Sequence, residues 1–177
     1  MSSYKRNKTQ GGTYFFTLVL KQRHNTNLLI DHFDLLKFST LKVKSKSPFK
    51  LPACVVMPDH LHMIMSLPKG DDNYAMRIRL IKTFFSKSLD LVEPVSNSMS
   101  RKNEKGVWQR RFWEHLIRDE QDLQRHIDYI HYNPVKHGYC NRADEWPYST
   151  FHNYVERGMY SRDWACDVKD ENFLVGE

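Results

Sequence analysis

One pair of histidines in the sequence has a spacing that could hold a metal ion. His60 and His62 flank Leu61 in a short apolar segment, a pattern that predicts a β-strand. Side chains alternate between the two faces of a strand, so both imidazoles point the same way, about 6–7 Å apart along the chain. Two imidazoles on a rigid surface can bind a divalent metal, although a third ligand is then needed. The alternative is an edge strand with two solvated histidines.

A predicted helix from Asp119 to about Asn133 supplies the second group of candidates. Aspartate is favoured at the start of a helix, and the proline at 134 and the glycine at 138 are expected to end this one. At about 100° per residue, one flank of the helix gathers four polar side chains. They are Asp122, His126, Tyr129 and Asn133. Tyr132 falls at about 180° from the core stripe, on the outer face.

Tyr129 and Asn133 are four positions apart and can address the same point in space. A phenolate is a competent nucleophile, but the pKa of a free tyrosine, about 10, keeps it protonated at neutral pH. A metal ion or a basic neighbour has to activate it, and a phosphoryl or acyl group is then the natural target. The alternative is an ordinary amphipathic helix with one polar flank.

Basic residues that could contact a polyanion occur in three segments: an N-terminal arm, a predicted helix and a predicted strand. They are Lys5, Arg6 and Lys8 in the arm (residues 1–10), Arg79 and Lys82 in the helix, and Arg110 and Arg111 in the strand. Arginine next to exposed aromatic rings suits single-stranded nucleic acid, because bases stack on the rings while the cations neutralise phosphates. The alternatives are a solvated helix face and aromatic side chains that belong to the core.

Composition agrees with an acidic partner and excludes several classes of protein. The 177 residues carry 27 Lys and Arg against 21 Asp and Glu, a formal net charge of +6. This balance points weakly toward nucleic acid. Three widely spaced cysteines without a CxxC pair exclude a disulfide framework or a thiolate zinc site, and suit a reducing cytoplasm. The longest apolar run is residues 53–57, and residues 1–6 are polar, so neither a membrane helix nor a secretion signal is expected.

The elements that must position these residues follow the order β-α-β-β-α-β-α. Strands are predicted over residues 13–20, 49–57, 60–67 and 107–117, and helices over 26–46, 74–89 and 119–133, with a short one in 146–157. Pro58 and Asp59 form a tight turn, and 90–106 a polar loop. The first six elements match a split β-α-β plan: an α+β, ferredoxin-like (RRM-like) antiparallel sheet with helices on one face.

We expect one domain over residues 1–157 and an acidic C-terminal tail over 158–177. The tail has five acidic and two basic residues on an otherwise basic chain. A flexible acidic segment could compete with phosphate for a basic surface. The alternative is a frayed terminus.

Several segments of the sequence resemble the REP-associated tyrosine transposases, a branch of the single-tyrosine HUH transposases. The segment that carries the resemblance furthest is HIDYIHYNPVKHG, residues 126–138. The others are GGTYFFT (11–17), MPDHLH (57–62), WQRRFWEH (108–115) and WPYSTFH (146–152). They occur in the expected order across residues 11–152.

The resemblance implies an HUH nuclease core in which His60 and His62 bind Mg²⁺ or Mn²⁺. It also implies Asn133 as the third ligand and Tyr129 as the nucleophile. Members of the family cleave single-stranded DNA beside a palindromic (REP) hairpin, leaving a 5′-phosphotyrosine and a free 3′-OH. By resemblance we expect a monomer in the bacterial cytoplasm, associated with the nucleoid, with no membrane partner.

Two other functions fit the same residues. A non-catalytic nucleic-acid-binding module of ferredoxin-like shape would stack bases on aromatic rings and form no covalent adduct. A small metal-dependent phosphodiesterase would use His60 and His62 to activate water, and its activity would survive loss of Tyr129. A metal-dependent adduct between protein and DNA separates the transposase from both alternatives.

Overall fold

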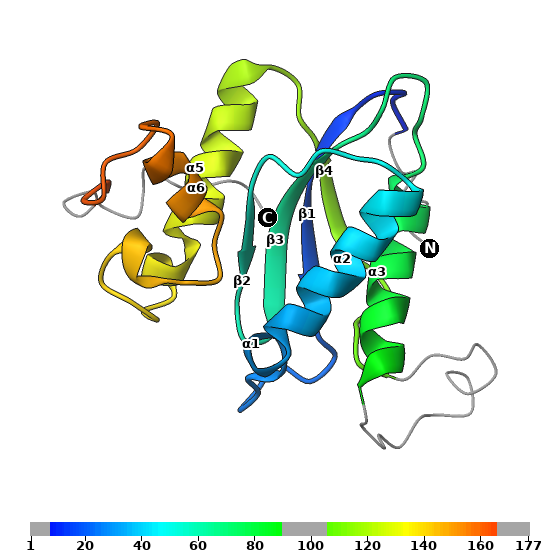
Figure 1. Cartoon of the computed structure of the whole chain (residues 1–177), viewed down its shortest axis with the longest axis horizontal. Coiled ribbons are helices and arrows are strands. Elements are labelled where there is room, and N and C mark those ends of the chain that lie inside the picture. Colours follow the sequence, from blue (N-terminus) through cyan, green and yellow to red (C-terminus); the bar gives the residue numbers. More distant parts are fainter. Residues whose placement is uncertain (1–7, 90–105, 166–177) are drawn as a thin grey trace, which may run out of the picture.

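The computed structural model describes residues 8–89 and 106–165, which form a four-stranded sheet with helices around it (Figure 1). The elements are β1 (Thr13–Val19), α1 (Leu28–Asp31), α2 (Phe33–Lys46), β2 (Cys54–Val56), β3 (His60–Ser66), α3 (Tyr74–Ser88), β4 (Trp113–Leu116), α5 (Glu120–Lys136), the 3₁₀ helix η1 (Ala143–Glu145) and α6 (Phe151–Glu156). The predicted order of strands and long helices is confirmed.

The strands lie in the order β2-β3-β1-β4, and every neighbouring pair is antiparallel. This is the ferredoxin-like order that the sequence predicts. The two central strands carry buried side chains on both faces, and successive side chains of β1 enter different clusters: Phe15 packs on one side, and Tyr14 and Phe16 on the other. A sheet with this pattern has to be covered on both faces.

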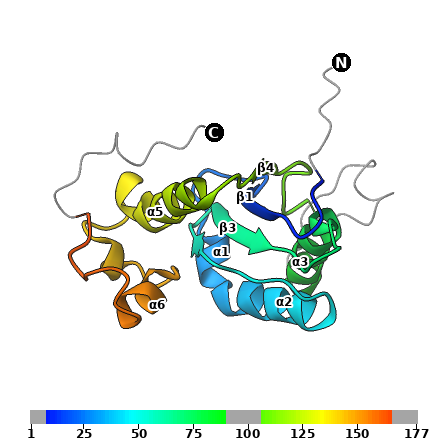
Figure 2. The same cartoon turned by 90° about the horizontal axis from the view of Figure 1, so that it is seen from above.

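Helices α2 and α3 pack on each other and cover one face, where Ile78 and Ile81 meet Phe16. Helix α5 covers the other face, where Ile127 and Ile130 meet Phe15. Figure 2 shows α2 and α5 on opposite sides of the sheet. The prediction of helices on one face therefore holds for α2 and α3, and α5 fills the second face.

Three predicted elements are shorter or broken in the structure. The helix expected over 26–46 is two helices, because the backbone of His32 leaves the helical region at φ −116°. The strand expected over 49–57 is regular only in β2, since Pro52 lacks the N–H that a sheet ladder needs. Of the strand expected over 107–117, β4 is regular, and Trp108 pairs with Leu20 as an isolated bridge.

Helix α5 is longer than predicted, because Pro134 lies inside its last turns instead of ending it. A proline there removes one backbone hydrogen bond, which a helix packed on a sheet can tolerate. The helix ends at Lys136, and Gly138 follows at φ +70°, the left-handed conformation common after a helix. The three extra residues include Lys136, which falls on the face that carries Tyr129.

The chain after α5 folds back onto it (Figure 1). The ring of His131 lies 4.7 Å from that of Tyr154 and 5.5 Å from that of Tyr160, measured between centroids. The Tyr160 hydroxyl donates to Asp128, and the Trp164 ring packs at a tilt against the Tyr160 ring, with 4.6 Å between centroids. Helix α5 is thus enclosed between the sheet and the segment 143–165.

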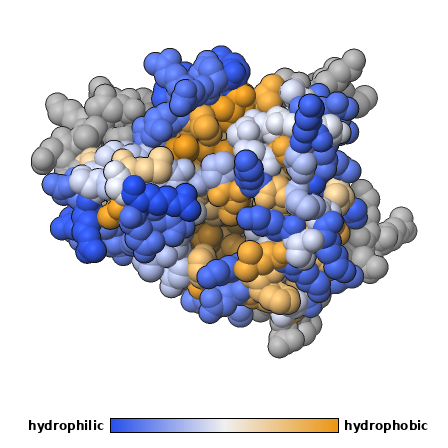
Figure 3. Space-filling view, turned by 45° about the horizontal axis from the view of Figure 1, so that its top comes forward, coloured by the Kyte–Doolittle hydropathy of each residue, from blue (hydrophilic) through white to orange (hydrophobic). Residues whose placement is uncertain are grey.

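Apolar side chains on the surface form patches among polar ones, as one face of the molecule shows in Figure 3. Among the large apolar residues that are exposed, Phe38 and Leu41 lie on α2. Within the described residues, no helix is both long enough and apolar enough to span a bilayer.

Candidate active site

Strand β3 presents His60 and His62 on the face that α5 covers. Their rings lie 5.0 Å apart between centroids, while Leu61 enters the opposite cluster, as the alternation predicts. β3 lies between β2 and β1, so the histidines are only 6% and 2% exposed. The alternative of an edge strand with solvated histidines is therefore wrong.

Each ring is held through Nδ1. The Nδ1 of His60 lies 2.6 Å from Oδ1 of Asp59, and the Nδ1 of His62 lies 2.9 Å from Oγ1 of Thr17. Asp59 ends the turn before β3 and is the neighbour of His60 in the chain, whereas Thr17 is the cross-strand partner of His62 in the β1–β3 pair. With Nδ1 engaged, Nε2 is the nitrogen with which each ring could bind a metal, and a carboxylate or hydroxyl behind a ligating histidine fixes its orientation.

The surrounding charges suit metal ligation. Burial opposes ionisation of Asp59, but hydrogen bonds from His60 and from Arg23, whose Nε lies 2.8 Å from Oδ2, outweigh it and lower the pKa of the carboxyl. Burial holds the pKa of His62 well below its ordinary value, and repulsion from His60 acts in the same direction. His62 is therefore neutral at physiological pH, as a metal ligand must be.

Helix α5 brings Tyr129 to the histidine pair. The Tyr129 ring lies edge-on to His62, with 5.3 Å between centroids, and is 2% exposed. Phe15 contacts both rings from the sheet, at 5.4 Å from His62 and 5.9 Å from Tyr129. A phenol and two oriented imidazoles thus share one site.

Asn133 lies one turn after Tyr129 and is fully buried. Neither its amide nitrogen nor its amide oxygen has a hydrogen-bond partner among the residues that the structure describes. Burying an amide without partners is costly, so the side chain has unused capacity to bind a ligand. Two imidazoles and an amide oxygen fit a divalent cation that completes its shell with water and phosphate oxygens.

Two further residues lie at this site, Lys136 and His137, and neither is predicted from the sequence. The Nζ of Lys136 lies 4.8 Å from the centroid of the Tyr129 ring, and the ring of His137 lies 5.4 Å from that of His60. Both are exposed, and both follow Pro134. A helix that ended at Asn133 could not place them, whereas its continuation puts Lys136 seven positions, or two turns, after Tyr129.

Tyr132 corrects a second expectation. It was expected on the outer face of the helix, but it is only 6% exposed. The spacing of residues along a helix gives only the direction of a side chain relative to the sheet. It does not show that the segment 143–165 also packs on α5, as the contact of His131 with Tyr154 does. The tyrosine ring that contacts the His62 ring is that of Tyr129.

Comparison with known proteins identifies the family of the chain. The chain is 44% identical over 177 residues to the REP-associated tyrosine transposase of Escherichia coli, covering all of this chain and 98% of that one. A protein of Haemophilus influenzae assigned to the same family is 46% identical over 166 residues, 93% of this chain and 94% of its own. The chain belongs to the REP-associated tyrosine transposase family. It is accordingly an enzyme that cleaves and rejoins DNA.

A solved REP-associated tyrosine transposase, bound to a REP hairpin, has the same fold. It superposes with a TM-score of 0.81 at 43% identity, covering 96% of this chain and 94% of that chain. No family model matches the sequence.

The predicted DNA-binding residues of the transposase belong to several different segments of the chain. Lys8, Arg79, Arg110 and Arg111 are exposed, and Lys5 and Arg6 lie outside the described residues. Arg79 and Lys82 belong to α3, across the sheet from α5. The Nζ of Lys82 donates to the backbone oxygen of Gln109 at 2.6 Å, which ties α3 to the segment before β4.

The aromatic residues interleaved with these arginines belong mainly to the core. Trp108 is 7% exposed, Phe112 packs edge-on to Phe16, and Trp113 packs edge-on to Phe15. The alternative that these aromatic side chains belong to the core is therefore the correct one.

A second cluster of ionisable side chains joins β4 to α5. It consists of His115, Asp122 and His126, which each offer a ligand atom, all within 4.8 Å of one another. Asp122 and His126 fall on the predicted polar flank of the helix, whereas the place of His115 depends on how β4 pairs with β1. Sequence spacing gives no signal for that contact.

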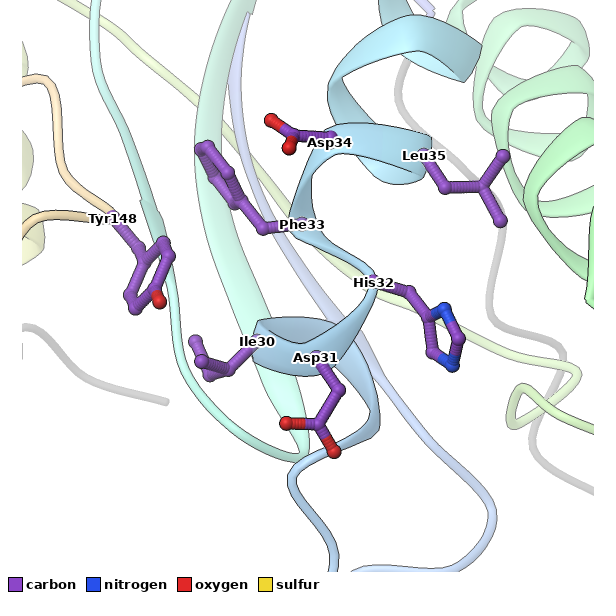
Figure 4. A pocket seen from close by; sticks show the side chains of 7 residues that line it. All are labelled: Ile30, Asp31, His32, Phe33, Asp34, Leu35 and Tyr148. Carbon is purple, nitrogen blue, oxygen red and sulfur yellow. The ribbon is translucent and has the colours of Figure 1, made fainter.

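A pocket of about 440 Å³ opens at the junction of α1 and α2 (Figure 4). None of the proposed site residues lines it. Its lining residues are Ile30, Asp31, His32, Phe33, Asp34, Leu35 and Tyr148. Two carboxylates make it a poor place for a phosphate backbone. The candidate active site of the transposase is instead the interface between β3 and α5.

Proposed function

We propose that this transposase cleaves single-stranded DNA beside REP-type palindromic hairpins, with Tyr129 as the nucleophile. The observation that carries the proposal is the contact of the Tyr129 ring with His62, on a strand where both histidines are oriented through Nδ1. The hairpin-bound relative, similar over nearly the whole chain, supports the choice of DNA.

In the proposed reaction, the Tyr129 oxygen attacks the scissile phosphorus. The bond from phosphorus to the 3′ oxygen breaks as the new bond forms, and the phenolic proton ends on the leaving oxygen as a 3′-OH. Attack of another 3′-OH on the phosphotyrosine reverses the exchange and rejoins DNA, so no external energy source is needed. Lys136, beside the Tyr129 ring, is placed to stabilise developing phenolate charge.

We propose that His60, His62 and Asn133 hold the divalent cation of the reaction, Mg²⁺ or Mn²⁺. The unpartnered amide of Asn133 and the orientation of both imidazoles support this ligand set. When bound, such a cation polarises the scissile phosphate and offsets the charge that develops on it. Asp59 keeps the proton of His60 on Nδ1, so that Nε2 retains its lone pair.

We further propose that one copy of the chain is sufficient for cleavage. The histidine pair and Tyr129 meet within a single chain, so the site needs no residue from a second copy. The exposed Lys8, Arg79, Arg110 and Arg111, with Lys5 and Arg6 of the arm, are the candidates for phosphate contacts.

The test of the proposal is the variant Tyr129→Phe, which keeps the ring and removes only the oxygen. We expect it to bind hairpin DNA with nearly unchanged affinity and to form neither a covalent adduct nor a 3′-OH product. The measurement is incubation with single-stranded hairpin DNA and Mn²⁺, followed by denaturing electrophoresis and mass spectrometry of the DNA–peptide. The matched control is Tyr132→Phe, which removes a hydroxyl from the same helix.

The control should retain adduct formation within about tenfold, the effect of at most one ordinary hydrogen bond. A nucleotide mapped to Tyr132 would overturn the assignment. Cleavage that persists in Tyr129→Phe without an adduct would instead favour attack by water.

The proposed ligands are tested by His60→Ala. Recognition of the hairpin is expected to rest on other residues, so this variant should bind DNA but no longer cleave it. Cleavage at the wild-type rate that still responds to chelator would show that the cation is held elsewhere.

A further inference from the structure

The cluster of His115, Asp122 and His126 has the composition of a metal site. The Nε2 of His115 lies 2.9 Å from Oδ2 of Asp122, and the Nδ1 of His126 lies 3.3 Å from Oδ1 of the same carboxylate. The two imidazoles stack, with 4.6 Å between centroids and 16° between planes. Two rings and a carboxylate from two separate elements therefore converge on one small volume.

The protonation of His126 leaves an unused ligand atom. Its Nδ1 lies 2.7 Å from the backbone oxygen of Asp122, which can only accept, so the proton is on Nδ1 and the lone pair on Nε2. That Nε2 is buried and has no partner among the residues described here, and the side chain is 2% exposed. Such an atom normally has a hydrogen bond or a metal to bind.

Both ligand types are in the state that a metal requires. Burial lowers the pKa of His126, which favours the neutral ring. Burial opposes ionisation of Asp122, but hydrogen bonds from His115 and Arg118 outweigh it and lower the pKa of the carboxyl. The positive group closest to the carboxylate is Arg118, with Nε at 3.1 Å from Oδ2, and its side chain is 67% exposed, so it can turn toward solvent.

We propose that His115, Asp122 and His126 bind a second divalent ion, a transition metal of the zinc class. Two imidazoles and one carboxylate favour Zn²⁺, Co²⁺ or Ni²⁺ over Mg²⁺, which prefers oxygen ligands, and water completes the shell. To ligate through Nε2, His115 moves its proton to Nδ1, and the His126 ring gives up its Nδ1 hydrogen bond to the Asp122 backbone and rotates to bring Nε2 to the ion. This site is distinct from the one at His60 and His62.

The ion would hold helix α5 on the sheet near the nucleophile. His115 belongs to β4, while Asp122 and His126 belong to the first turns of α5, so the ion would link the two elements. Tyr129 follows His126 by three positions, and the ring of Phe15 contacts both, at 5.0 and 5.9 Å between centroids. The three ligands are thus positioning residues for Tyr129.

The test measures metal binding, not cleavage, in the full-length chain without an affinity tag. The double variant His60→Ala/His62→Ala removes the proposed catalytic ligands. After chelator treatment, this variant should still bind one equivalent of Zn²⁺ by mass spectrometry of the dialysed protein. Bound Co²⁺ should give the visible absorption of a four-coordinate site, and Zn²⁺ should raise the thermal unfolding midpoint.

Adding His115→Ala to the double variant should weaken Zn²⁺ binding at least about tenfold and abolish the Zn²⁺-dependent rise in the midpoint. His115 is partly exposed, so this change should not prevent folding. The matched control adds His24→Ala, an exposed histidine outside both clusters, and should change nothing.

Two results would overturn the proposal. Either the folded double variant binds no Zn²⁺ at micromolar concentration, or His115→Ala leaves its binding unchanged. In both cases the three residues would be a hydrogen-bond network only. These results leave the role of Tyr129 untouched, because that role is tested by the covalent adduct.

Discussion

A hydroxyl group on the neighbouring strand helps to orient the ring of His62. Thr17 faces His62 across the β1–β3 pair, and its Oγ1 lies 2.9 Å from Nδ1. A histidine that lacks such a partner can rotate or change tautomer, and it then loses affinity for the metal. The same argument applies to Asp59 behind His60.

Thr17→Val should weaken Mn²⁺ binding and slow DNA cleavage by about 10- to 100-fold, the range measured for residues behind metal ligands. Valine has nearly the shape of threonine and a high preference for strands, so the fold should persist. The measurements are Mn²⁺ titration and the rate of adduct formation.

The matched control is Thr13→Val on the same strand, where the lost hydroxyl bonds Ser66 instead of a histidine. If both variants slow cleavage equally, the effect belongs to the strand and not to the orientation of His62.

His131 makes the stability of the protein depend on pH. Burial lowers its pKa to about 3, and its Nε2 lies 3.0 Å from Oγ1 of Thr150. Because the folded pKa is below that of the unfolded chain, about 6.5, the unfolded state takes up more protons between these values. The contribution of the neutral ring is therefore complete above pH 6.5 and is lost as pH falls toward 3.

His131→Phe removes this titration and keeps an aromatic ring among Phe151, Tyr154 and Tyr160. Between pH 7.5 and pH 5, the wild-type protein should lose on the order of 2 kcal/mol more unfolding free energy than the variant. Urea unfolding at both pH values measures the difference. Equal losses would mean that His131 is not the group responsible.

Helix α5 carries residues of both the proposed active site and the second cluster. It carries Tyr129, Asn133 and Lys136, and two of the three side chains of the second cluster. Its start is fixed by Asp119, whose Oδ1 accepts a hydrogen bond of 2.7 Å from the backbone N–H of Asp122. This is the N-cap predicted from the sequence, and it aligns the first turn against β4.

Asp119→Ala should lower the unfolding free energy by about 1 kcal/mol, the usual effect of removing an N-cap. Asp119→Asn is the control, because asparagine caps as well as aspartate, and its stability should stay near that of the wild type. Urea unfolding in the presence of chelator compares the three proteins without a contribution from metal. An equal loss in both variants would assign the effect to the negative charge and not to the cap.

Charge is distributed unevenly along the whole chain. The chain carries a formal net charge of +6, although residues 166–177 contain four acidic residues and one basic residue. These residues lie outside the described structure, whereas Tyr160 and Trp164 before them pack on the domain. Removal of 166–177 raises the net charge by three and leaves those packed residues in place.

This truncation should increase the affinity for single-stranded hairpin DNA and the yield of adduct, most strongly at low salt. Competition between carboxylates and phosphates is greatest where screening is weakest. Titrations at about 50 and 200 mM salt check this, because the gain should shrink at the higher concentration. Unchanged or weaker binding at low salt would exclude a competing role for the acidic tail.

The sequence by itself predicted the order of the elements, the ferredoxin-like sheet and the shared face of His60 and His62. These features follow from the period of two residues in a strand and about 3.6 in a helix, which are local properties of the backbone. The assignment of Tyr129 and Asn133 came from helical spacing together with the resemblance of residues 126–138 to a known family. The contact of Tyr129 with His62 agrees with that assignment.

Only the tertiary structure decided which neighbours complete the site. Thr17 meets His62 through strand register, and His115 meets Asp122 through the pairing of β4 with β1 and the docking of α5. Lys136 reaches Tyr129 because the helix continues through Pro134, and Tyr132 is buried in a helix on which the C-terminal segment folds back. Each of these contacts joins residues whose approach depends on packing between elements, and no local period in the sequence encodes that packing.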